Sequence, residues 1–142
     1  MKNKAFTLME LLVVIFIILT IATIAIISVG KVRENSRNTK RVSDVKQIQF
    51  ALEMYYRDNG NYPIELNFGD QLASSGTTYM ERVPSNPNPR EDGSCPNEEY
   101  LYESGETSYQ LQFCTSNANG DISSGYNCAT PIGIEGGVCI FP

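Results

Sequence analysis

The stretch FTLMELLVVIFIILTIATIAIISV, residues 6–29, decides how this chain folds. Its only charged residue is Glu10, and neither Pro nor Gly interrupts it. A helix rises about 1.5 Å per residue, so residues 8–29 alone would extend about 33 Å, enough to cross the hydrocarbon core of a bilayer. The stretch therefore predicts a helix that spans a membrane.

Glu10 is the unusual residue of this stretch. A carboxylate one turn into an apolar span costs roughly 2.5–3.5 kcal/mol on insertion scales. Such a residue either lies close enough to the interface to stay solvated or protonated, or it has a partner and a function. The residues that surround Glu10 favour a function.

Residues 2–12, KNKAFTLMELL, resemble the N-terminal processing motif of type IV pilins and type II secretion pseudopilins. In that family a short basic leader ends in a small residue, which an aromatic residue follows, and a Glu stands four positions after the aromatic. The corresponding residues here are Lys2, Lys4, Ala5, Phe6 and Glu10. The resemblance implies that a prepilin peptidase removes the leader, residues 1–5, by cutting between Ala5 and Phe6, and that the new amine of Phe6 is methylated.

The same resemblance implies how the protein assembles. Glu10 would meet the Phe6 amine of a neighbouring subunit, and a buried carboxylate and a buried ammonium each remove the desolvation cost of the other. Residues 6–29 would form the core of a helical filament of identical subunits, with the heads outside. The implied partners are other copies of the chain, the prepilin peptidase and methyltransferase, an assembly platform and the cytoplasmic membrane.

Beyond the apolar stretch the helix is predicted to continue. Apolar residues recur at intervals of three and four from residue 42 onward, which gives the helix one apolar face; they are Val42, Val45, Ile48, Leu52 and Tyr55. Asn59 and Gly60 accept positive φ and Pro63 forbids continuation, so the helix is expected to run from about Thr7 to Arg57. Residues 51–63, ALEMYYRDNGNYP, also resemble the segment that closes the long helix in major pseudopilins.

The remaining residues predict a small sheet. Residues 100–103 and 108–114 form a hairpin pattern around a turn at 104–106. Tyr109, Leu111 and Phe113 share one face of the second arm, which we expect to pack on the apolar face of the helix. Residues 63–96 and 125–139 are interpreted as loop-like and irregular, with a candidate final strand at 138–141. The predicted class is α+β, a pilin fold in which residues 30–142 form the head.

The chain has four cysteines, all in its last 48 residues: Cys95, Cys114, Cys128 and Cys139. An even number of cysteines in a small loop-rich region indicates disulfides and an oxidising compartment. Zinc is the alternative, but no CxxC pair is present, and the ligands of a structural zinc usually come in such pairs. Spacing leaves three pairings open, of which Cys95 with Cys114 and Cys128 with Cys139 gives the shortest loops.

Charge is divided unevenly along the chain. Residues 1–57 carry nine Lys or Arg against four acids, a net of +5, whereas residues 58–142 carry two Arg against twelve acids, a net of −10. An acidic head repels phosphates, so nucleic acid is not an expected partner. The basic residues after the span would place the head in the cytoplasm by the positive-inside rule, but the cysteines and the family resemblance both place it outside, in a single-pass topology.

Catalysis and metal binding are not expected. The chain contains no His, which removes the usual general base and the Ser-His-Asp and Cys-His arrangements. No phosphate-binding loop or dinucleotide fingerprint is present. Asn117, Asn119 and Asp121 alternate like ligands of a hard cation, so calcium is a minor candidate, although one carboxylate in a Gly-Asn loop is usually only a turn.

Three functional interpretations remain from the sequence. The first is a filament subunit, whether of a retractable pilus, a secretion pseudopilus or a DNA-uptake system. The second is a monomeric single-pass protein whose disulfide-bonded extracellular head binds a ligand or a surface. The third is a membrane-anchored enzyme, which the missing general base disfavours.

Overall fold

The computed structural model describes residues 6–140, and over this range it contains one long helix and six short strands. The chain divides into two compact units, Met1–Glu34 and Asn35–Pro142. Helix α1 comprises Leu8–Asn59, which confirms the single long helix predicted from the sequence. Together with the antiparallel strands it gives the α+β class that the sequence predicts, consistent with a pilin fold.

In the first unit, α1 exposes apolar side chains around its whole circumference from Leu8 to Ile24. The two threonines of this stretch satisfy their own hydroxyls within the helix. Thr20 Oγ1 donates to the carbonyl oxygens of Phe16 and Ile17 at 3.0 and 2.8 Å, and Thr23 Oγ1 donates to Thr20 O at 2.8 Å. No hydroxyl of these threonines therefore needs water, as an apolar environment requires.

The end of α1 follows the stop signal in the sequence. Gly60 has a φ of 76°, and its N–H donates to Tyr56 O at 2.8 Å. Asn59 Nδ2 donates to Tyr55 O at 2.9 Å, so a second carbonyl of the last turn also has a partner. This glycine-terminated end is the one expected where the residue after the helix must adopt positive φ.

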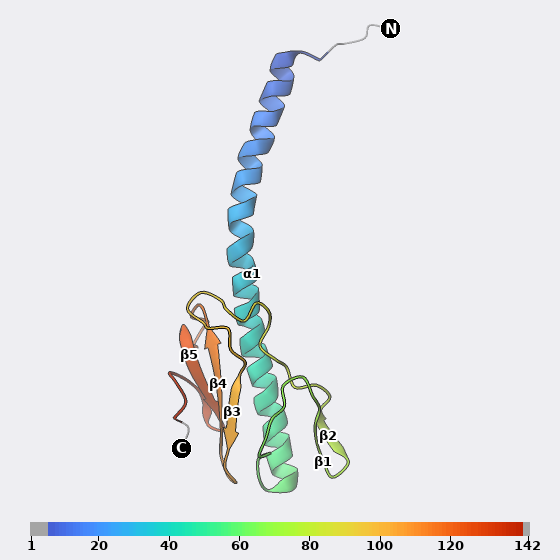
Figure 1. The fold of residues 1–142 in the computed structure, drawn as a ribbon, viewed down its shortest axis with the longest axis vertical. Coiled ribbons are helices and arrows are strands. Elements are labelled where there is room, and N and C mark those ends of the chain that lie inside the picture. The colour runs from blue at the N-terminus through green and yellow to red at the C-terminus, as the bar shows by residue number, and fades with distance from the viewer. Residues whose placement is uncertain (1–5, 141–142) are drawn as a thin grey trace. The chain divides into compact units, whose positions relative to one another are not determined.

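The larger sheet of the second unit is a four-stranded antiparallel meander. Its strands are β3 (Leu101–Ser104), β4 (Tyr109–Thr115), β5 (Gly125–Thr130) and β6 (Gly133–Gly136), and they pair in that order. Figure 1 shows β3, β4 and β5 to the left of the second half of α1. The predicted hairpin corresponds to β3 and β4, which pair with Tyr102 opposite Leu111.

The core of the second unit lies between α1 and this sheet. The side chains of Val45, Ile48 and Leu52 from α1 and of Tyr109, Leu111 and Phe113 from β4 are all buried and belong to one cluster. Their alternation along β4 and their spacing along α1 are the two patterns on which the sequence prediction relied. The predicted contact between these two faces is confirmed.

The prediction that residues 125–139 are irregular is wrong, because β5 and β6 occupy most of this range. The inward positions of β5 are Asn127 and Ala129, so a polar residue occupies a core position and hides the alternation. Asn127 Nδ2 donates to Thr115 Oγ1, Ser123 O and Gly125 O at 3.0–3.2 Å, so the amide nitrogen of this buried side chain has acceptors. The candidate strand at 138–141 is also wrong over its described part, 138–140, which has no regular structure.

The prediction that residues 63–96 are loop-like is wrong at one place, a short hairpin of β1 (Leu72–Ser74) and β2 (Thr77–Met80). Its two-residue turn is Ser75-Gly76, with φ values of 50° and 83°. Two successive positive φ values define the type I′ turn that matches the twist of a hairpin, so Ser75 and Gly76 join the two strands directly. The ring of Tyr79 lies 5.2 Å from that of Tyr55, which attaches the hairpin to α1.

Candidate functional site

The first candidate site is the N-terminal end of α1, where Thr7 and Glu10 bond to each other. Thr7 N and Thr7 Oγ1 each donate to Glu10 Oε2 at 2.9 Å, and Glu10 N donates to Thr7 Oγ1 at 3.2 Å. This reciprocal arrangement is a capping box, in which a Thr before the first helical residue and a Glu three positions later satisfy amides that the helix leaves open. Glu10 therefore has a structural partner within its own chain, one that the sequence analysis did not consider.

The residues around this cap are exposed and apolar. Phe6, Leu8 and Met9 are 75, 81 and 70% exposed. α1 contains a stretch long and apolar enough to cross a membrane, as judged by length and composition. A continuous apolar surface of this extent is not stable in water, so lipid or other protein chains must cover it. Of the predicted processing residues, Phe6 and Glu10 are in the described range, whereas Ala5 lies outside it.

A second site, which the sequence analysis missed, is a polar cluster buried between α1 and the loop before β3. The side chain of Arg41 is fully buried. Its guanidinium donates to Asn86 Oδ1 at 2.9 Å, Asn38 Oδ1 at 3.0 Å, Arg90 O at 3.0 Å and Asp92 Oδ2 at 3.3 Å. Every nitrogen of this buried cation thus has an acceptor, as the burial of a charge requires.

Asp92 is the anion of this buried polar cluster and binds two arginines. Arg37 donates Nε to Asp92 Oδ2 at 2.7 Å and Nη2 to Asp92 Oδ1 at 2.8 Å, a bidentate pair of the kind that arginine and carboxylate favour. These bonds, together with the charges of Arg37 and Arg41, hold the pKa of the Asp92 carboxyl below its ordinary value, although burial opposes them. The cluster fastens the loop that contains Asp92 to α1.

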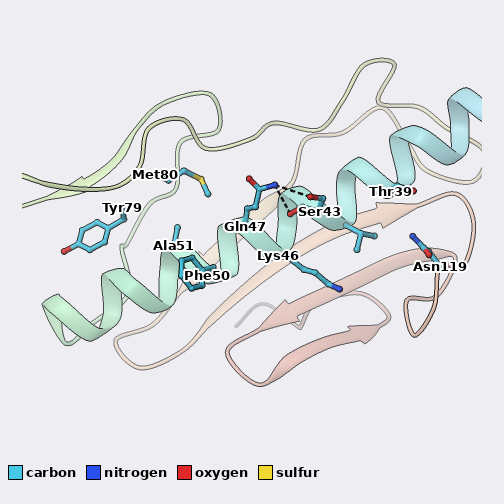
Figure 2. A pocket seen from close by; sticks show the side chains of 10 residues that line it. Thr39, Ser43, Lys46, Gln47, Phe50, Ala51, Tyr79, Met80 and Asn119 are labelled. Carbon is cyan, nitrogen blue, oxygen red and sulfur yellow. Dashed lines mark hydrogen bonds between the residues drawn. The ribbon is translucent and has the colours of Figure 1, made fainter.

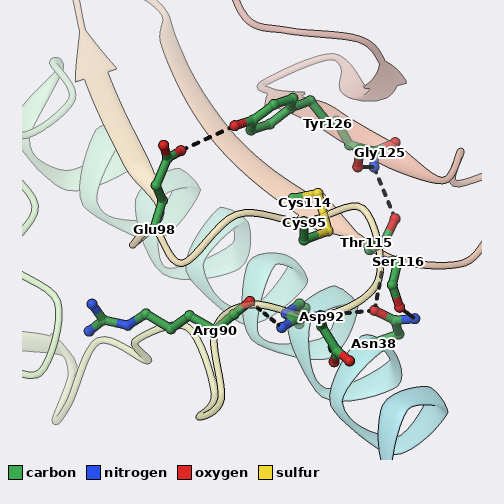
Figure 3. The surroundings of a disulfide bond; sticks show 12 residues. Asn38, Arg90, Asp92, Cys95, Glu98, Cys114, Thr115, Ser116, Gly125 and Tyr126 are labelled. Atoms are coloured by element: carbon green, nitrogen blue, oxygen red, sulfur yellow. Dashed lines mark hydrogen bonds and ion pairs between the residues drawn. A yellow bond between two sulfur atoms is a disulfide. The ribbon is translucent and has the colours of Figure 1, made fainter. Parts of the chain in front are cut away.

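The four cysteines form two disulfides, Cys95–Cys114 and Cys128–Cys139, and no cysteine among the described residues is free. This is the pairing with the shortest loops. Cys95 also exchanges backbone hydrogen bonds with Asp92 at 3.0 and 3.2 Å. Figure 3 shows the disulfide of Cys95 beside Asp92 and Asn38, so one covalent link and one ionic cluster hold the same loop.

The three calcium candidates lie in the loop between β4 and β5. Asn119 and Ile122 exchange backbone hydrogen bonds at 3.0 and 3.2 Å, and Asp121 lies in the turn between them. Asn117 Nδ2 donates to Asn35 Oδ1 at 3.2 Å. Within the described residues no three His, Cys, Asp or Glu side chains gather as a metal site would require. The loop contributes a single carboxylate, so calcium remains only a sequence-based prediction.

The comparison with known proteins bears on the first of these sites. Residues 1–28 match the prokaryotic N-terminal methylation motif. This motif is the signature of type IV pilins and pseudopilins, so the match supports the resemblance that residues 2–12 indicate. No curated protein and no solved structure matches the chain significantly. The motif and the exposed apolar helix fit a membrane-anchored pilin.

Proposed function

We propose that this chain is the repeating structural subunit of a filament outside the cytoplasm, either a type IV pilus or a type II secretion pseudopilus. The observation that carries the proposal is the methylation motif over residues 1–28, joined to a helix whose apolar side chains are exposed on every side. A surface of that kind is suited first to lipid and then to the helices of neighbouring subunits. The function is assembly, and no catalytic role is proposed for the head.

Processing would change the chain only at its beginning. The prepilin peptidase hydrolyses the peptide bond between Ala5 and Phe6, which leaves a new α-amine on Phe6 for methylation. Thr7 keeps its amide after the cut, so the capping box with Glu10 survives in the mature chain. The apolar helix stays with the mature protein and keeps it in the cytoplasmic membrane, with the head outside.

Glu10 would then serve two purposes. In a single chain, Thr7 donates to one oxygen of its carboxylate and stabilises the start of the helix. In the filament, the Phe6 ammonium of a neighbouring subunit would add a charge-assisted hydrogen bond, and each charge would offset the desolvation of the other. Pairing of this kind favours entry of a correctly processed subunit, because an unprocessed chain has no amine at Phe6.

The decisive measurement is the intact mass and the N-terminal residue of the protein, taken from membranes and from sheared surface fractions of its native cells. We expect a chain that begins at methylated Phe6 and is present in both fractions. A chain that keeps residues 1–5 and is absent from the sheared fraction would contradict the proposal. It would favour the alternative, a monomeric single-pass protein with an extracellular binding head.

Substitutions at Glu10 separate its two purposes. Gln is the other residue found at this position of a capping box, so Glu10→Gln keeps the cap but removes the charge. We expect this variant to insert and to be processed, yet to be lost from sheared filaments. Thr7→Ala is the matched control, because it removes the two hydrogen bonds of the Thr7 hydroxyl and leaves the carboxylate. A normal filament yield from Glu10→Gln would contradict the charge pairing.

A further inference from the structure

A groove of about 570 Å³ runs along the second half of α1 on a face that the sheet does not cover. Its apolar walls come from Val42, Phe50 and Ala51 of α1 and from Tyr79 and Met80 of β2. Figure 2 shows the β2 residues along one side of the helix and Lys46 near Asn119 on the other. The side chain of Phe50 is 69% exposed, so covering its ring with another apolar surface would be favourable.

The groove carries one charge. Lys46 is the only ionisable lining residue other than the phenol of Tyr79, and it is exposed. Among residues 6–140 it forms no ion pair, whereas Lys40, six residues earlier on the same helix, pairs with Asp44 at 2.9 Å. The groove thus combines an apolar floor with an available cation, and a matching surface would offer an apolar side chain beside a carboxylate.

The outer face of β3 is such a surface. Residues alternate along a strand, so Tyr102 points to the core while Leu101 and Glu103 point outward, and both of these are exposed. β3 is an edge strand, with β4 as its only partner in the sheet. Within the described chain Glu103 forms no ion pair, as is true of Lys46. The head has an apolar and acidic pair on this face.

The two pairs have similar spacing. Lys46 and Phe50 are four residues apart on a helix, so their Cβ atoms are about 5–6 Å apart. Leu101 and Glu103 are two residues apart on a strand, which separates them by about 6.6–6.8 Å. A leucine placed against the ring of Phe50 would therefore bring the following carboxylate close to the ammonium of Lys46.

We propose that this groove receives the outer face of β3 from a second copy of the chain, with Leu101 against Phe50 and Glu103 against Lys46. The two surfaces point in different directions. At about 100° per residue, Lys46 and Phe50 lie about 100° and 140° around α1 from Val45, which faces the sheet. A contact between two different surfaces of identical chains is heterologous, so it continues from copy to copy and does not close as a dimer.

This inference rests on the proposed filament and adds a contact between heads to the packing of the N-terminal helices. It is consistent with the charge of the two parts, because the cation of the groove belongs to the basic first 57 residues and the carboxylate to the acidic remainder. Complementary charges at the edge of an interface set the register and speed the encounter. The contact would fix how each head is placed against the next.

The test is a photoreactive phenylalanine analogue at position 50 of the full chain, expressed in its native cells and irradiated in membranes and in sheared filaments. We expect a crosslinked dimer whose digest joins position 50 to the peptide that contains Leu101 and Glu103. The same analogue at Ile132, which is 97% exposed on the turn after β5, is the control and should not reach β3. Filaments in which position 50 crosslinks elsewhere, or not at all, would overturn this contact and leave the filament itself intact. If neither filaments nor dimers form, both proposals are wrong.

A charge exchange tests the same contact independently. We expect Lys46→Glu and Glu103→Lys each to lower the yield of sheared filaments by roughly fivefold or more, because like charges then face each other. The double exchange should restore most of the yield. Glu65→Lys, an equally charged change at another exposed position, is the control and should have little effect. Failure of the double exchange to recover, with intact processing and a protease-resistant head, would contradict the pairing.

Discussion

Asp92→Asn removes one negative charge from the buried polar cluster while it keeps the size of the side chain. Two cations would then lose their anion, the fully buried Arg41 and Arg37, whose side chain is 22% exposed. An asparagine offers one acceptor oxygen in place of two and adds an amide that faces the guanidinium groups. The substitution therefore tests whether this cluster holds the head together.

The expected loss of stability can be estimated from the hydrogen bonds that the two arginines keep in the variant. Removing one partner of a buried ion pair costs about 3–5 kcal/mol, since it leaves an uncompensated charge. Arg41 would keep its bonds to Asn38, to Asn86 and to the carbonyl of Arg90, and Arg37 can gain water. We therefore expect a loss near the lower limit, about 3 kcal/mol of the free energy of unfolding.

Urea unfolding of the full chain in detergent, followed by near-UV circular dichroism, measures this loss. The chain has eight Tyr and no Trp, so the signal reports the packed tyrosines of the head. Asp58→Asn is the matched control, because the pair of Asp58 with Arg57 is largely exposed. Exposed pairs contribute about 0–1 kcal/mol, so the control should remain close to the parent chain.

The pH dependence of the free energy of unfolding is a second test of the role of Asp92. Because the folded-state pKa of Asp92 is lowered, its contribution is present above the unfolded value of about 3.9 and is lost as the pH falls below that value. The parent head should lose stability in this range, and Asp92→Asn should lose less. If Asp92→Asn costs no more than Asp58→Asn at neutral pH, the buried polar cluster does not stabilise the head as argued.

Three further outcomes are expected. Replacing both Cys128 and Cys139 by Ser should cost about 3 kcal/mol, because the disulfide closes a loop with a sequence separation of 11; urea unfolding measures it, and an unchanged midpoint would contradict it. Gly60→Ala should lower the free energy of unfolding by about 1 kcal/mol, because residue 60 has a φ of 76°. Gly30→Ala, inside the helix, should raise it by about 0.5–1 kcal/mol. Thermal unfolding of both variants checks these opposite signs. Burial raises the pKa of Tyr102 to about 12. The contribution of the neutral phenol to stability is therefore present below about pH 10 and is lost as the pH rises towards 12. An alkaline titration of phenolate absorbance in which every tyrosine of the folded protein ionises near pH 10 would contradict this.

The helix, its end and the main hairpin were predictable because their signals are local. An apolar run without Pro or Gly, a recurrence at three and four, and an Asn-Gly before Pro63 each act over a few residues. The alternation of Tyr109, Leu111 and Phe113 is likewise visible in seven consecutive residues. In each case the physical cause and the sequence signal occupy the same short segment.

The buried polar cluster was missed because it depends on contacts between distant residues. Arg41 and Asp92 are separated by 51 positions, and within KVRENSRNTKR a buried arginine has the same appearance as an exposed one. Asn127 occupies an inward position of β5, where its amide nitrogen donates to three oxygens, and a polar residue at such a position interrupts the apolar alternation by which a strand is recognised. The capping box of Thr7 is different, because its signal, T-x-x-E over residues 7–10, is as local as its hydrogen bonds.

The order of the strands in the larger sheet has a consequence for how the head forms. Each strand pairs with the next one along the chain, so β3 to β6 can join by successive hairpins, each of which closes only a short loop. Topologies of such low contact order fold quickly. Docking of this sheet on α1 joins residues that are far apart in sequence, such as Leu111 and Val45, so it closes a longer loop than any of the hairpins does. A head built in this way leaves strand edges unpaired only briefly while it folds, which limits the time in which an exposed sheet can aggregate.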